Sequence, residues 1–170
     1  MSKYMSRFKL VLYAPVDATK AVDSLTASYK EFLSEEKNKK YLHTTWMLDN
    51  CLIHDCDEHV DTRYILERVR DNLVKLNLIK FISDEDIHKY LKDKNLQKSD
   101  LLSFSQVYIM AVKLGIRYRL TGRLSNLRQR SLSDEKDKNY YYFNTHVTDI
   151  ATNVISVAAD FQYGKSRGYF

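Results

Sequence analysis

The hydrophobic pattern of the sequence changes its period at about residue 115, and this change limits the fold more than any other feature. Before that point apolar residues recur at the i, i+3, i+4 spacing of helices, and afterwards they alternate with polar residues as in half-buried strands. The alternating part predicts three consecutive strands over 116–127, 139–150 and 153–163. A polar loop at 131–138 and a tight turn at 149–153 would join them.

The first part of the chain alternates helical segments with short strand-like segments. Together with the strands that follow, this order predicts an α/β fold in which a single mixed β-sheet is packed with about four α-helices. The expected organisation is an extended N-terminal arm over 1–15, one globular α/β domain over 16–165 and a C-terminal tail over 166–170. The elements expected before residue 115 are a helix after Pro15, with Asp17 placed to cap it, that ends in a polar run at 34–40, a strand over 44–53, a helix capped by Asp61 or Thr62, a strand over 78–82, a helix begun by Ser83 and a helix after Ser103.

Two local signals mark the ends of the fourth helix. Ser103-x-x-Gln106 has the form of a capping box at its start. Gly115 is placed to end it, because glycine adopts the left-handed C-cap conformation without steric cost. The apolar residues that give this segment its helical spacing are Val107, Tyr108, Ala111, Val112 and Leu114.

Glycine and proline are scarce, with four glycines and one proline in 170 residues. Average usage would give roughly twenty. The scarcity excludes a glycine- or proline-rich linker, and it leaves no G-x-G-x-x-G or G-x-x-x-x-G-K-[ST] loop for binding phosphates. The length and the ordinary hydrophobic content of 44% fit one domain.

The densest group of possible metal ligands or acid–base side chains lies at residues 54–61. It has two interpretations, a strand-to-helix loop whose carboxylates cap the helix, or a metal or acid–base site. Elsewhere no two histidines stand at i, i+4, and no G-x-S-x-G nucleophile motif occurs. We therefore expect a protein that is not an enzyme. The group consists of His54, Asp55, Asp57, Glu58, His59 and Asp61.

The two cysteines and the chain start bear on location. Five extended residues span about 16 Å, so Cys51 and Cys56 are either unlinked thiols or, in an oxidising compartment and across a sharp turn, a disulfide. No apolar run reaches the length of a membrane span, and the apolar stretch near the start is too short for the core of a signal peptide. The chain is expected in the cytoplasm if it is complete as written.

Arginine is concentrated in the first of the three C-terminal strands, within a chain of net charge +5. Alternation places Tyr118, Leu120, Gly122 and Leu124 on the core face, and it leaves the intervening residues on the other face. The following strand adds an aromatic run at 140–143. The candidate partner-binding residues are Arg117, Arg119, Thr121, Arg123 and Tyr140.

This arginine and tyrosine face has three interpretations. It can be a solvated sheet face, with arginines lying over aromatic rings and paired with nearby carboxylates. It can bind a protein, because arginine and tyrosine are enriched at interface hot spots. It can also bind single-stranded nucleic acid through phosphate contacts and base stacking.

Several segments resemble the LpoB-type activators of penicillin-binding proteins. The resemblance covers roughly residues 16–165, and its motifs are structural rather than catalytic. In the C-terminal hairpin the family commonly has Gly-Glu where this chain has Asn153-Val154, and asparagine also tolerates a left-handed turn conformation. The segments that carry the resemblance are 58–73, Lys113-Leu-Gly-Ile-Arg-Tyr-Arg-Leu-Thr-Gly-Arg-Leu-Ser125, Asn139-Tyr-Tyr-Tyr-Phe143 and Thr148-Asp-Ile-Ala-Thr-Asn-Val-Ile155.

The resemblance implies a fold similar to the N-terminal domain of TolB. It also implies a regulator, without a cofactor or small-molecule substrate, that binds a class A penicillin-binding protein and stimulates its glycan polymerisation and cross-linking. Such a protein would lie in the periplasm, anchored to the outer membrane through a lipid in its full-length precursor. The lipid-bearing cysteine and the tether of the family are absent from this sequence. The alternatives are a nucleic-acid-binding module that uses the arginine face, or a cell-envelope assembly or secretion component of the same fold.

Overall fold

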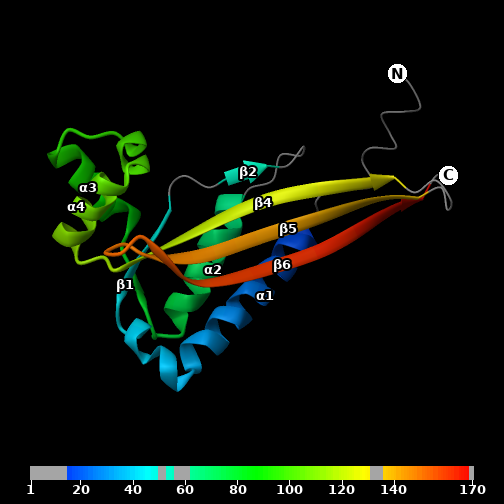
Figure 1. Ribbon diagram of the computed structural model, residues 1–170, viewed down its shortest axis with the longest axis horizontal. Coiled ribbons are helices and arrows are strands. Elements are labelled where there is room, and N and C mark those ends of the chain that lie inside the picture. Colours follow the sequence, from blue (N-terminus) through cyan, green and yellow to red (C-terminus); the bar gives the residue numbers. More distant parts are fainter. Residues whose placement is uncertain (1–14, 50–52, 56–61, 131–135, 169–170) are drawn as a thin grey trace.

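The computed structural model describes residues 15–49, 53–55, 62–130 and 136–168. In this part of the chain one sheet is packed with helices on both of its faces, and the three C-terminal strands form a long ribbon (Figure 1). The single mixed sheet with about four α-helices that the sequence predicts is confirmed. In chain order the elements, with η for 3-10 helices, are α1 (Pro15–Ser34), η2 (Glu36–Tyr41), β1 (Thr45–Leu48), β2 (Ile53–Asp55), α2 (Thr62–Lys75), β3 (Lys80–Phe81), α3 (Asp84–Asp93), η3 (Lys98–Leu102), α4 (Phe104–Leu114), β4 (Tyr118–Arg130), β5 (Lys136–Asp149) and β6 (Val154–Gly168).

The sheet has the order β3-β1-β4-β5-β6, and β2 also pairs with β4. β1 and β2 run parallel to β4, whereas β5 and β6 continue the sheet antiparallel. The single strand expected over 44–53 is wrong, because β1 ends at Leu48 and β2 begins at Ile53. Both pieces nevertheless pair with the same strand, and the polar Asp49 and Asn50 interrupt the apolar run at the break.

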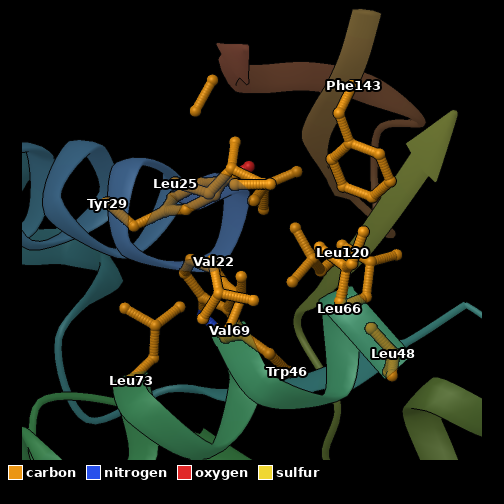
Figure 2. Close-up of a cluster of buried hydrophobic side chains, with 14 of the residues drawn as sticks. Val22, Leu25, Tyr29, Trp46, Leu48, Leu66, Val69, Leu73, Leu120 and Phe143 are labelled. Carbon is orange, nitrogen blue, oxygen red and sulfur yellow. The ribbon is translucent and has the colours of Figure 1, made fainter. Parts of the chain in front are cut away.

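The main hydrophobic core lies between the sheet and the helices α1 and α2 (Figure 2). The helical spacing of apolar residues after Pro15 predicts α1, and those residues form the buried face of the helix. Burying a large apolar side chain contributes about 1.5–3 kcal/mol, so this layer is the main source of stability. Its fully buried members include Leu25, Tyr29, Trp46, Leu66, Leu73, Leu120 and Phe143.

A second, smaller core lies on the other face of the sheet, under α3, η3 and α4. The sheet contributes Met47, which points away from its buried neighbours Trp46 and Leu48 because successive side chains of a strand alternate. Ile116 and Ile150, which flank β4 and β5, complete the contact with Val107, Met110 and Ala111 of α4. The helices α3 and α4 therefore cover one end of this face (Figure 1).

Two turn predictions are confirmed and one capping prediction is wrong. Gly115 ends α4 with a φ of 72°, and Asn153 has a φ of 55° in the turn between β5 and β6. Ser103, however, makes no capping hydrogen bond to the α4 backbone, because its hydroxyl bonds to that of Ser105 instead. Gln106, the other residue of the expected capping box, is half-buried.

The ends of the domain differ from the expected boundaries. α1 already includes Pro15, and the rest of the arm expected over 1–15 lies outside the described residues. β6 continues to Gly168, and residues 166–168, which were expected in a tail, pair with β5. The loop expected at 131–138 is shorter, because β5 begins at Lys136.

Candidate partner-binding surface

The face of β4 that points away from the main core is the surface that the sequence predicts for partner binding. Tyr118, Leu120, Gly122 and Leu124 are buried, as alternation predicts. Arg119 and Thr121 are partly exposed, and Arg123 is exposed. The strand therefore brings Arg119, Thr121 and Arg123 onto one face, and we call this side of β4–β6 the open sheet face.

The antiparallel register adds side chains that the sequence analysis did not identify. His146 and Asn144 of β5 lie directly opposite Thr121 and Arg123. On β6, Asp160 lies opposite Asn144 and is exposed. Residues directly opposite each other in a sheet share a face. The open sheet face is therefore polar and of mixed charge rather than uniformly basic.

Arg119 lies at the boundary between the open sheet face and the α3–α4 layer. Its Nε is 3.7 Å from Asp49 Oδ2, and only 21% of its side chain is exposed. The Nε is fully buried and forms no hydrogen bond within the described part of the chain. Burial lowers the pKa of the neighbouring His146, and the positive charge of Arg119 lowers it further, against a smaller opposing effect of Asp49. The lowered pKa therefore favours the neutral form of His146 beside the cation Arg119.

Arg117 lies just before β4 and is held by a different contact. Its guanidinium donates to Asp149 Oδ2 at 3.0 Å, and about half of the side chain is exposed. Asp149 raises the pKa of Arg117, first through its charge and then through the hydrogen bond. Arg117 therefore fastens the start of β4 to the end of β5, and its exposed side borders the α3–α4 end of the open sheet face.

Tyr140 also lies on the open sheet face, but farther along the ribbon. It pairs with Leu127, four residues beyond Arg123 on β4, which corresponds to about 14 Å along the strand. Of the aromatic run that begins at Tyr140, Tyr141 and Phe143 are completely buried in the main core. Only half of the run is therefore available for base stacking, which weakens the nucleic-acid interpretation.

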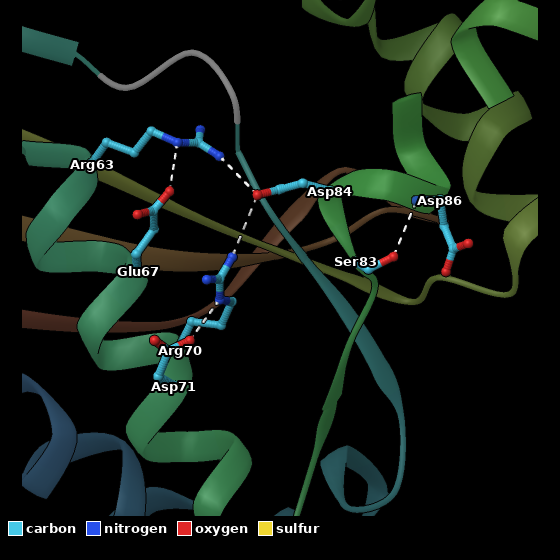
Figure 3. Close-up of polar contacts among 7 residues, drawn as sticks. All are labelled: Arg63, Glu67, Arg70, Asp71, Ser83, Asp84 and Asp86. Atoms are coloured by element: carbon cyan, nitrogen blue, oxygen red, sulfur yellow. Dashed lines mark hydrogen bonds and ion pairs between the residues drawn. The ribbon is translucent and has the colours of Figure 1, made fainter. Parts of the chain in front are cut away.

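A charged cleft lies between α2 and α3 (Figure 3). Arg63 Nε is 2.8 Å from Glu67 Oε1, and its Nη2 lies 3.5 Å from Asp84 Oδ2. Arg70 approaches the same oxygen of Asp84 at 3.8 Å. Because these four charges pair with one another, their ion pairs hold the start of α3 against α2. Ile87, His88 and Lys98 complete its lining.

The other candidate chemistry falls largely outside the described residues. Cys51 and Cys56 lie there, as do Asp57, Glu58, His59 and Asp61 of the possible metal-binding group, and β2 includes the remaining His54 and Asp55. Within the described ranges no three His, Cys, Asp or Glu side chains gather as metal ligands would. In the same ranges no helix has the length and apolar character needed to span a bilayer.

The fold and this surface define a class, an α/β domain whose mixed sheet is covered by helices on one face and left partly open on the other. The model of the family described as peptidoglycan-synthase activator LpoB matches residues 16–159. The chain belongs to the LpoB family of peptidoglycan-synthase activators. A comparison with the sequences of curated proteins found no significant match.

Solved structures of LpoB share the fold. The LpoB C-terminal domain from Escherichia coli superposes with a TM-score of 0.64 at 12% identity, covering 84% of this chain and 97% of that one. The domain from Salmonella enterica has a TM-score of 0.62 at 13% identity, covering 86% and 98%. The NMR structure of Escherichia coli LpoB has a TM-score of 0.57 at 11% identity, covering 86% and 68%. At these identities the likeness shows the fold alone.

Proposed function

We propose that this protein binds a bifunctional, class A penicillin-binding protein and stimulates its synthesis of peptidoglycan. The observation that carries the proposal is the match of the activator family to residues 16–159, which include all the buried residues of the two cores. An activator of this kind works as an allosteric ligand, because it shifts the enzyme only to the extent that it binds the active conformation more tightly than the inactive one.

The open sheet face is the proposed contact for the synthase. Arg123, Asn144 and Asp160 lie directly opposite one another on three neighbouring strands and form an exposed row. The row places a cation, an amide and a carboxylate side by side. Such a row suits a polar partner surface, because opposite charges and hydrogen bonds fix the orientation of two proteins. Arg117, Arg119, Thr121 and Tyr140 extend the row to either side.

We place this activity in the periplasm, where peptidoglycan synthases work, with a lipid at the outer membrane as the anchor of the precursor. The protein would act there as a regulator rather than as a catalyst. The ion pairs at the α2–α3 cleft fit this role, because Arg63, Arg70 and Glu67 of α2 and Asp84 of α3 pair with each other and join the two helices.

The test is glycan-strand polymerisation by the purified class A penicillin-binding protein of the same organism, with and without the full chain. We expect a severalfold higher rate with the chain present and direct binding in a titration. Arg123→Glu should raise the Kd by about tenfold, the effect of an interface hot-spot residue. Lys75→Glu, an exposed charge reversal at the end of α2, is the matched control and should leave the Kd unchanged. Failure of the wild-type chain both to bind and to stimulate contradicts the proposed function.

A further inference from the structure

α4 exposes one apolar face to solvent. Val112 is 67% exposed and Ile109 is 52% exposed, while Phe104 and Tyr108 are each 43% exposed. The four residues are spaced i, i+4, i+5 and i+8, so they lie on one side of the helix. We call them the α4 stripe. Tyr108 and Val112 belong to the apolar residues whose spacing predicts this helix, and the structure exposes both of them.

The other side of the same helix is already used. Val107, Met110 and Ala111 are buried in the second core against the sheet. A surface helix ordinarily has one apolar side and one polar side, and a helix that is apolar on both sides is usually covered on both. The rings of Phe104 and Tyr108 contact each other with their centres 6.2 Å apart. The stripe is therefore an apolar surface in which two aromatic rings are in contact. No other segment of the described part of the chain covers it.

The size of the stripe indicates what kind of partner covers it. Large side chains bury on the order of 200 Å² each, so four that are about half exposed present on the order of 400 Å². A stable interface buries about 800 Å² on each partner. Two stripes packed against each other would therefore bury too little for a stable homodimer. The stripe instead has the size of the apolar centre of a larger interface with a polar rim.

The polar surface that could form such a rim lies next to α4 in the chain. α4 ends at Leu114, and β4 begins at Tyr118 after the left-handed Gly115. The turn is fastened, because Ile116 N donates to Ala111 O and Arg117 N donates to Thr45 O. α4, which carries the stripe, and the start of β4 are thus held together at the same end of the molecule (Figure 1).

We propose that the α4 stripe binds an apolar surface of the peptidoglycan synthase and supplies the hydrophobic centre of that interface. This inference rests on the proposed function and deepens it. The open sheet face would form part of the polar rim, which sets orientation, while the stripe contributes most of the affinity. Truncating the rim charges should consequently change mainly the salt dependence of synthase binding. Removing the stripe should mainly raise the Kd.

The experiment uses the full chain and the purified class A penicillin-binding protein of the same organism. The main variant is Ile109→Gln with Val112→Gln, because glutamine keeps the helix propensity and removes the apolar surface. The matched pair is Val112→Gln on α4 and Val74→Gln on α2, two exposed valines in helices, of which Val74 is 45% exposed. Thermal unfolding of every variant checks the fold, and sedimentation velocity measures self-association.

We expect the double variant to raise the Kd for the synthase at least tenfold and to abolish stimulation at a fixed protein concentration. Val112→Gln should raise the Kd severalfold at unchanged melting temperature, and Val74→Gln should leave it unchanged. If the double variant unfolds, the Kd of Val112→Gln compared with that of Val74→Gln decides whether the stripe binds the synthase.

Two results overturn the proposal and leave the proposed function standing. One is synthase binding by Ile109→Gln/Val112→Gln with the wild-type Kd. The other is a wild-type dimer that the double variant dissociates, because the stripe is then covered by a second copy of the chain. A wild-type chain that neither binds nor stimulates the synthase overturns the proposed function itself, and the stripe proposal with it.

Discussion

The hydroxyl oxygen of Tyr29 lies 2.7 Å from Thr145 Oγ1, where α1 crosses β5 in the main core. Thr145 Oγ1 in turn donates to the backbone oxygen of Ala159 on β6, also at 2.7 Å. A hydroxyl has one proton to donate, so Tyr29 is the donor in the first bond. Burial raises the pKa of Tyr29 far above its usual value. This short relay joins α1 to two strands and satisfies two buried hydroxyl groups.

The relay predicts an asymmetry between two conservative substitutions. Thr145→Val leaves the Tyr29 hydroxyl buried without a partner, which costs about 1–3 kcal/mol. Tyr29→Phe removes the donor but leaves Thr145 bonded to Ala159, and it should cost about 1 kcal/mol. Urea unfolding of both variants measures the difference in the free energy of unfolding. Equal losses, or a larger loss in Tyr29→Phe, would show that the relay does not run in this direction.

Gly122 provides the close approach of α2 to the sheet. A Cβ added at this position would lie 2.7 Å from Leu66 Cδ1, which is much shorter than a van der Waals contact. Because Leu66 is fully buried, it has little room to move, and Gly122→Ala should destabilise the protein by about 1–3 kcal/mol. The measurement is the free energy of unfolding in urea.

The control for Gly122→Ala is a double variant. Leu66→Ala alone should cost about 2–5 kcal/mol because it leaves a cavity. In Gly122→Ala/Leu66→Ala the new methyl enters that space, so the combined loss should be smaller than the sum of the two single losses. Strict additivity would mean that the contact with Leu66 is not the cause.

Gly115 is required for its backbone conformation rather than for space. Its φ is 72°, and an added Cβ would meet no atom within 4 Å. Gly115→Ala should therefore cost about 1 kcal/mol, from the left-handed conformation alone. Gly115→Asn should cost less, because asparagine adopts this conformation more readily. Melting temperatures of the two variants provide the comparison, and a loss in Gly115→Asn as large as that in Gly115→Ala would contradict it.

His146 predicts a loss of stability on mild acidification. Its pKa is lowered in the folded protein, so below the ordinary histidine pKa of about 6.5 the unfolded chain binds the proton more readily than the folded one. The stabilising contribution is complete above that pH and is lost as the pH falls through and below it. His146→Gln should thus lose less stability than the wild type between pH 7.5 and pH 5. Urea midpoints across this range test it, with His88→Gln on the exposed side of α3 as the control.

Alternation and helical spacing predicted the open sheet face and the covered face, since both are local properties of the chain. Arg119, Thr121 and Arg123 share a face because a strand repeats every two residues. The contribution of His146, Asn144 and Asp160 was not predicted, because it depends on the register between strands. Asn153 in the left-handed conformation helps to set that register, and the sequence indicated the turn without showing which pairs it aligns.

Apart from the break between β1 and β2, the sequence by itself determined the order of the α-helices and strands, the core side of β4 and the left-handed turns at Gly115 and Asn153. Each of these depends on residues within a few positions of one another. The tertiary structure alone decided that β1 and β2 both pair with β4, that Tyr141 and Phe143 enter the main core, and that α4 buries Met110 while Val112 faces solvent. These outcomes depend on contacts between distant segments. An apolar residue indicates only that burial is favourable, and the position of the neighbouring layers decides which apolar residues are buried.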